Sequence, residues 1–237
     1  TLLPDGRILY DRWEYVDRPA IPIQSLWTIN PDGTGLSVYF GNRVLSPGTF
    51  MEARPIPDTT KIICTMTGHN GPTRGAIGII DRSLGVNAQE AIENLTPDVP
   101  VPPVGQGNGN TDGTKQYSCP YPLDALRFLV SIQGPLLVRD YSGTCQALVF
   151  PAPDDGMQYF NAQPVRPRHR PPSIPATLAS TGDEAGEAAM ATVYVQDVYR
   201  GLSPHVQRGD VERIRVVREL QKTVRIDPSL RAFGFQF

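Results

Sequence analysis

The sequence has little charge and few cysteines, and both shortages exclude classes of protein. Only 19% of its 237 residues are charged, and the formal net charge is −2. The chain has no excess of basic residues that would indicate nucleic-acid binding, and it has no acidic run that would indicate a disordered tail. The three cysteines, Cys64, Cys119 and Cys145, lie far apart and form no CxxC or CxxCH motif. The sequence therefore predicts at most one disulfide, leaves their redox state open, and offers no covalent attachment for c-type haem.

Long apolar runs and catalytic motifs are missing too. No stretch approaches the ~18 consecutive apolar residues of a membrane span, so we expect none. The string nearest to GxSxG, at residues 81–85, lacks the first glycine. The sequence contains no HExxH motif and no Cys/His cluster, which are the patterns that indicate a zinc site. With only His69, His169 and His205 in the chain, nothing points to a Ser–His–Asp triad, and we predict no catalytic residue.

Proline and glycine, in contrast, are plentiful. The chain has 24 prolines and 22 glycines, which makes proline about twice its usual ~5% share. Prolines at this density interrupt helices and favour short strands with many loops. One such turn, Pro-Asp-Gly-Thr-Gly at residues 31–35, separates two β-forming runs at 26–29 and 36–40.

An internal repeat is the strongest pattern in the sequence. Segments 4–10, 57–64 and 122–130 each combine a proline, a short polar turn with an Asp, one basic residue and an apolar run. Each is followed by a second strand that ends in a turn and by a third strand. Asn30, Asp81 and Asp140 take equivalent places, where their side chains are expected to accept a bond from a backbone N–H of the turn.

Units of about four strands that repeat every ~50–60 residues are typical of β-propeller blades. One small antiparallel sheet cannot bury both of its faces alone, and stacking of sheets buries them. A β-sandwich with unrelated turns is the alternative, but turn and strand recur in phase. We therefore predict an all-β fold with four-stranded antiparallel blades in a partial propeller, followed by a linker and a short β segment.

The expected layout has three parts. About three blades occupy residues 1–165, a linker rich in proline, alanine and glycine occupies 166–191, and residues 192–237 begin another β domain with strands at 192–199 and 211–217. Three blades are too few to close a propeller of common size. We expect as partners other blades or domains of a parent protein, or protein subunits, and no nucleic acid.

Extended strings of the chain resemble known proteins. PDGTGLSVYFGN at residues 31–42 resembles the repeat of TolB-type propellers. The strings at residues 8–42 and 52–85 resemble the propeller region of proteins related to the hydrazine synthase alpha subunit, and residues 193–220 are similar to the start of that family's middle domain. The resemblance implies an extracytoplasmic, periplasmic or secreted, protein in which a propeller precedes a domain with c-type haem. Because CxxCH is absent, a haem would have to lie in an adjoining domain or on a partner.

Two polar loops offer weak candidate sites. His69, in a loop between two strands, could line a channel or bind a metal, although a structural role fits a single histidine better. Asn108, Asn110 and Asp112 match the first half of an EF-hand-like calcium loop. The match then fails, because Cys119 stands where the bidentate Glu is required, and a flexible loop is the better interpretation.

Three functions remain open from the sequence. The first, which we favour, is a non-catalytic propeller that serves as a scaffold or interaction module of a larger extracytoplasmic, redox-associated protein. The second is a component of a haem-dependent oxidoreductase resembling the hydrazine synthase alpha subunit. The third is the substrate-gating propeller of a peptidase-like enzyme. Fold alone does not decide among them, because propellers have many functions.

Overall fold

A computed structural model describes most of the first three quarters of the chain and part of its end. The described residues are 1–14, 23–69, 73–104, 116–176, 193, 195–202 and 204–215. The chain divides into two compact units, Thr1–Gly182 and Asp183–Phe237. All strands of the described residues lie in the first unit.

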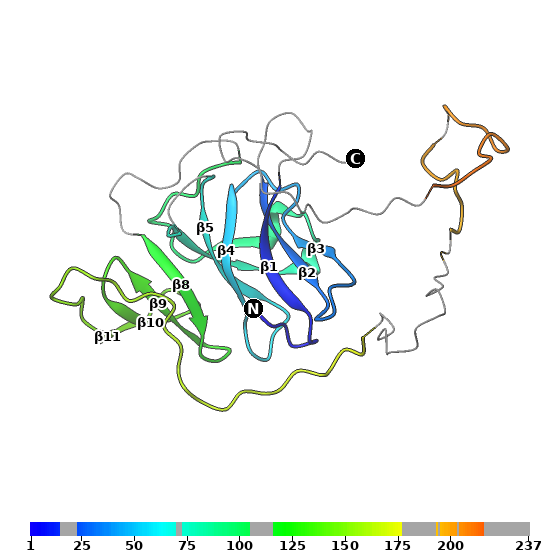
Figure 1. The fold of residues 1–237 in the computed structure, drawn as a ribbon. Coiled ribbons are helices and arrows are strands. Elements are labelled where there is room, and N and C mark those ends of the chain that lie inside the picture. The colour runs from blue at the N-terminus through cyan, green and yellow to red at the C-terminus, as the bar shows by residue number, and fades with distance from the viewer. Residues whose placement is uncertain are drawn as a thin grey trace, which may run out of the picture. The chain divides into compact units, whose positions relative to one another are not determined.

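The first unit is all-β, as predicted, and its strands form a seven-stranded sheet (β1–β7) and a four-stranded sheet (β8–β11) (Figure 1). Only one parallel residue pair joins β2 to β4, so we divide the larger sheet there into two antiparallel parts. We call these two parts sheets 1 and 2, and the four-stranded sheet is sheet 3. Sheet 1 comprises β1 (Ile8–Glu14), β2 (Ile23–Ile29) and β3 (Ser37–Phe40). Sheet 2 comprises β4 (Thr49–Pro55), β5 (Ile62–Thr67), β6 (Ala76–Ile80) and β7 (Ile92–Asn94). Sheet 3 comprises β8 (Tyr117–Pro122), β9 (Arg127–Ile132), β10 (Leu136–Asp140) and β11 (Gln146–Phe150).

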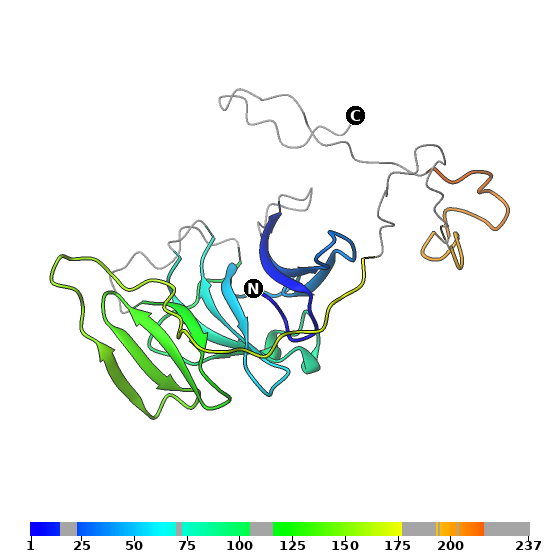
Figure 2. The same ribbon diagram turned by 60° about the horizontal axis from the view of Figure 1, so that its bottom comes forward.

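The sheets meet at their first strands. β4 contacts β1 and β2 of sheet 1 and β8 of sheet 3, and one parallel pair, Gln24 with Thr49, connects sheets 1 and 2. Figures 1 and 2 show β4 between the blue strands of sheet 1 and the green strands of sheet 3. In sheet 1 the first-strand place is taken by residues 1–3, where Leu2 pairs with Ile8. Two short 3-10 helices, η1 (Arg82–Leu84) and η2 (Gln89–Ala91), connect β6 to β7.

The predicted repeat is confirmed at the level of single hydrogen bonds. In each sheet, a backbone N–H where the first strand ends donates to the carbonyl of the basic residue in the turn: Leu3 to Arg7 at 2.8 Å, Ile56 to Lys61 at 3.0 Å and Leu123 to Arg127 at 2.9 Å. When residues 1–3 are counted as the first strand of sheet 1, the third strands of the three sheets are β2, β6 and β10. These strands carry Trp27, Ile79 and Val138 respectively. The four-stranded, blade-like unit is therefore complete in sheets 2 and 3.

Two of the three predicted turn caps are present. Asp81 accepts a hydrogen bond from the backbone N–H of Ser83 at 3.1 Å, and Asp140 accepts one from the N–H of Cys145 at 3.1 Å. Burial opposes ionisation of Asp140, but the hydrogen bonds from the Thr144 and Ser142 hydroxyls and from the Cys145 N–H together hold its pKa below the usual value. Both carboxylates therefore fix the turn that follows the third strand of their sheet.

The third predicted cap, Asn30, is wrong in detail. Its side-chain amide donates to the Thr34 hydroxyl at 3.2 Å, and the backbone N–H of Thr34 instead donates to Asp32 at 2.9 Å. Asp32 lies two residues before Thr34, which is the spacing of an Asx turn. Its carboxylate therefore accepts the Thr34 backbone N–H in place of Asn30.

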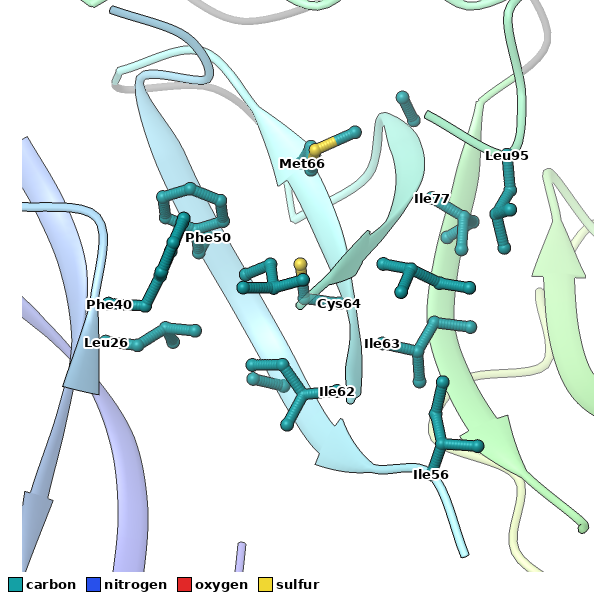
Figure 3. Packing of buried hydrophobic residues seen from close by; sticks show 14 of the residues in the cluster. Leu26, Phe40, Phe50, Ile56, Ile62, Ile63, Cys64, Met66, Ile77 and Leu95 are labelled. Atoms are coloured by element: carbon teal, nitrogen blue, oxygen red, sulfur yellow. The ribbon is translucent and has the colours of Figure 1, made fainter. Parts of the chain in front are cut away.

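Sheet 2 forms the centre of the core because another sheet lies on each side of it. Every residue of β5 and β6 is buried. Figure 3 shows Phe50, Ile62, Ile63 and Ile77 in the resulting cluster, with the Cys64 thiol among them. Each fully buried aliphatic side chain of this kind contributes about 1.5–3 kcal/mol. Stacking therefore supplies the stability that a single small sheet lacks.

Sheet 3 is covered much less than sheet 2. One of its faces packs on sheet 2 through Phe128, Val130 and Leu137. The other face holds a separate small cluster of Tyr121, Leu129 and Leu136. All five residues of β11 are exposed.

Residues 151–176 carry no strand or helix and run back along the first unit (Figure 2). The Arg166 guanidinium donates a hydrogen bond to the carbonyl of Leu123. Pro172 and Ile174 lie against Gly6, which has a φ of +90°. The remainder of the expected linker, residues 177–191, lies outside the described residues.

The second unit does not show the two expected strands in its described residues. Within 192–199 and 211–217, the described residues are in turns, a bend or irregular backbone. Asp197 accepts a hydrogen bond from the N–H of Tyr199 at 3.0 Å and pairs with Arg208 at 2.5 Å. The expected strand at 192–199 is replaced by a turn that the Asp197 carboxylate closes, and no neighbouring strand is present among the described residues. No helix in the described part of the chain is long and apolar enough to cross a membrane.

Candidate functional site at the first strands

Two side chains in equivalent places connect sheets 2 and 3. Glu52 in β4 has a φ of +56° and Cys119 in β8 a φ of +52°. Each lies within a shift of the strand register, a β-bulge. Left-handed backbone costs an L-residue roughly 1–2 kcal/mol, and bulges of this kind redirect a side chain out of the regular strand pattern.

The redirected side chains contact each other. The Glu52 carboxylate accepts hydrogen bonds from the Cys119 N–H at 2.6 Å, from the Cys119 thiol at 2.9 Å and from the Thr65 hydroxyl at 2.7 Å. Burial, together with the adjacent Glu52 carboxylate, raises the pKa of the Cys119 thiol to about 12. The thiol is therefore protonated at neutral pH and acts as a hydrogen-bond donor rather than as a nucleophile.

A second layer of contacts lies two residues further along the same strands. The Arg54 guanidinium lies 5.0 Å from the centre of the Tyr121 ring and donates to the Asn161 side-chain oxygen at 2.7 Å. Burial lowers the pKa of Arg54 from its ordinary value. Arg168 approaches the same ring, at 5.5 Å from its centre. Cation–π contacts of this geometry contribute about 0.5–2 kcal/mol.

Together these side chains form a set that we call the first-strand cluster: Glu52, Arg54, Cys119, Tyr121 and Asn161. It comes from β4, from β8 and from the segment after β11, and it holds these three parts of the chain together. No sequence pattern indicates this cluster, because neither a glutamate nor a cysteine in a strand predicts left-handed backbone. The available signal was the Pro-apolar pair that ends each first strand, at residues 55–56 and 122–123.

His69 lies at a different place. It is buried, with 9% of its surface exposed, and its ring makes an edge contact with Trp13 at 5.2 Å between centres. Burial lowers the pKa of His69, which favours the neutral ring. Its Nδ1 makes no hydrogen bond within the described residues. A channel or metal role for His69 stays a prediction.

The calcium candidates Asn108, Asn110 and Asp112 lie outside the described residues, so that prediction also stays open. Within the described ranges, no group of three or more His, Cys, Asp or Glu side chains is arranged to hold a metal ion.

The chain has a distant structural similarity to a known protein. No model of a protein family matches the chain, and no curated protein matches it. Among solved structures, the chain is similar to Kuenenia stuttgartiensis hydrazine synthase, with a TM-score of 0.46 and 19% sequence identity. The similarity covers 65% of this chain and 19% of that chain, so this chain spans about a fifth of the length of its structural neighbour.

Proposed function

We propose that this chain is a non-catalytic β-propeller module that serves as a scaffold for other protein segments. The observation that carries the proposal is the change in burial from sheet 2 to sheet 3. Every residue of β5 and β6 is buried, whereas every residue of β11 is exposed, including Leu148, Val149 and Phe150. Apolar side chains gathered on an outer strand are typical of a surface that contacts another protein segment.

The chemistry of the buried thiols supports a structural role. The carboxylate of Glu52 already accepts three hydrogen bonds, and the Cys119 thiol is one of the donors. Cys64 is fully buried, and burial strongly raises the pKa of its thiol. Reactive cysteines need a lowered pKa and partial exposure, and these two have neither.

We further propose that the module belongs to a larger extracytoplasmic, redox-associated protein. The support is the resemblance of residues 8–42, 52–85 and 193–220 described above. In such a protein a c-type haem would be held by an adjoining domain or a partner, and this chain would position that domain.

Cys145 offers a direct test of the scaffold proposal, because it is exposed and the other two cysteines are buried. The purified chain is labelled at Cys145 with a photoactivatable maleimide, mixed with extract of the cells that make the protein, irradiated and analysed by mass spectrometry. We expect cross-links to polypeptide outside residues 1–237. Cross-links confined to residues 1–237 would overturn the proposal. The variant Cys145→Ser is the control, and a pyridine haemochrome spectrum of the same preparation reports the haem alternative.

A further inference from the structure

The segment that follows β11 repeats the sequence of a first strand. Residues 50–56 read FMEARPI, residues 117–123 read YSCPYPL, and residues 159–165 read YFNAQPV. All three share an aromatic residue at the first place, Ala or Pro at the fourth, Pro at the sixth and an aliphatic residue at the seventh. The first copy is β4 from its second residue onward together with Ile56, and the second copy is β8 together with Leu123.

The backbone repeats as well. The third residue of each copy, Glu52, Cys119 and Asn161, has a φ of +56°, +52° and +54° respectively. Positive φ is uncommon for residues other than glycine, and only a few per cent of them adopt it. Its recurrence at one place in three copies therefore marks a common conformation of the segment.

The packing completes the correspondence. β8 contacts β4, β5 and β6, the first three strands of the sheet before it. Tyr159 and Ala162 pack against the cluster of Tyr121, Leu129 and Leu136, which lie on β8, β9 and β10. Those are the first three strands of sheet 3, so residues 159–165 take the same place on sheet 3 that β8 takes on sheet 2.

We propose that residues 159–165 are the first strand of a fourth sheet, and that they form, with the part of this face of sheet 3 that stays exposed beside them, a docking surface for three further antiparallel strands. The partner is a three-stranded antiparallel sheet that pairs with residues 159–165 and turns an apolar face to sheet 3. Residues 166–176, which follow the segment, hold no strand that could pair with it. The inference rests on the proposed scaffold function and specifies what the scaffold binds.

The ladder of sheet 3 identifies the side chains on this surface. Leu136 pairs with Phe150 and Val138 with Ala147, so these four residues share the face that carries Tyr159. The Phe150 ring lies 5.7 Å from the Tyr159 ring, yet 52% of Phe150 is exposed. Leu148 pairs with Leu137 and points to the opposite face.

The strands that pair with β4 in sheet 2 provide the probe. A fluorescent synthetic peptide of residues 57–95, with Ser in place of Cys64, contains β5, β6 and β7. It is titrated into the full 237-residue chain and followed by fluorescence anisotropy. We expect saturable binding of one peptide per chain, with slower hydrogen exchange at the amides of Phe160 and Ala162 in the complex.

Two charge substitutions on β11 locate the binding surface. Phe150→Asp places a carboxylate on the proposed surface and is expected to weaken peptide binding by about tenfold or more. The matched control, Leu148→Asp, alters a similarly exposed residue on the opposite face and is expected to change the affinity by less than about twofold.

Absence of saturable binding, or equal loss in the two variants, would overturn the fourth-sheet inference. If Cys145 cross-links still reach other polypeptides, the scaffold function survives and only the sheet-like partner is wrong. If the peptide binds but no cross-link leaves residues 1–237, the surface exists and the scaffold function fails.

Discussion

The Glu52 carboxylate accepts hydrogen bonds from both the backbone N–H and the thiol of Cys119, at 2.6 and 2.9 Å. The two residues occupy the same place in successive sheets, and each has left-handed backbone. Their contact joins sheet 2 to sheet 3 where the first strands meet. The energetic cost of two unusual backbone conformations is thereby offset by hydrogen bonds to a charged group, which contribute about 1.5–3 kcal/mol each.

Replacing Glu52 is therefore expected to destabilise the first unit. Glu52→Gln keeps the size of the side chain, but a neutral amide accepts more weakly and directs an NH2 group toward one of the donors. We expect a loss of about 1–3 kcal/mol in the free energy of unfolding, measured by urea titration. Glu93→Gln on β7, an exposed glutamate, is the control, with an expected change below about 0.5 kcal/mol. Equal effects in the two variants would show that the Glu52 contacts are not stabilising.

The three thiols are expected to react in two classes. Cys145 is exposed, whereas Cys64 and Cys119 are buried and have raised pKa values. Ellman's reagent at pH 8 should titrate one thiol rapidly in the native protein and all three in guanidinium chloride. Rapid native reaction of a second thiol would contradict the described environment of Cys119, and Cys119→Ser would identify it.

Gly6 is predicted to tolerate no side chain. An added Cβ would lie 2.5 Å from the carbonyl oxygen of Pro172, and the φ of +90° is itself strained for alanine. Gly33, with a φ of +83° and no atom within 4 Å of its added Cβ, is the matched control. Both alanine variants should lose about 1–2 kcal/mol from the backbone strain. Gly6→Ala should lose more, and equal Tm values for the two variants would show that residues 172–174 do not lie against this turn.

Burial of His69 predicts a pH dependence of stability. Burial lowers its folded-state pKa below the ordinary value near 6.5, so the unfolded chain binds a proton first as the pH falls. The stabilisation is complete above the unfolded pKa and is lost as the pH falls from there through the folded pKa. The urea concentration at the unfolding midpoint should therefore decrease as the pH is lowered below about 6.5. The variant His69→Leu should show a smaller decrease. An unchanged pH profile in the variant would exclude His69 as the cause.

Packing in sheet 2 should be far less tolerant than on β11. Ile63 is fully buried, and Ile63→Ala is expected to cost about 2–5 kcal/mol through lost burial and the cavity that it leaves. Val149, which is 39% exposed on β11, is the comparison, and Val149→Ala should cost less than about 1 kcal/mol. Thermal or urea unfolding followed by tryptophan fluorescence measures both. Similar losses would mean that β11 is as well packed as sheet 2.

The sequence predicted the repeat well because its signals are local. The Pro-Asp turns before β1 and β5 and the Asp124 turn before β9 determine where each second strand begins, and the apolar run that follows forms the strand. The first-strand cluster was not predictable in this way. A positive φ at Glu52 or Cys119 depends on contacts between residues 67 positions apart, which no local pattern encodes. The same holds for Asn161, whose partner Arg54 lies 107 positions earlier in the chain. The strands predicted at 192–199 and 211–217 failed in the opposite direction, since the described residues of these ranges form turns, a bend or irregular backbone.

The central claim is that residues 159–165 lie on sheet 3 as the first strand of a further sheet, and one solution measurement tests it directly. Nuclear Overhauser contacts between the Tyr159 ring and the methyl groups of Leu129 or Leu136 would be recorded on the full chain in the absence of any partner. We expect such contacts, together with backbone chemical shifts at Asn161 that are typical of left-handed conformation. Random-coil shifts across residues 159–165, without a contact to either leucine, would contradict the claim.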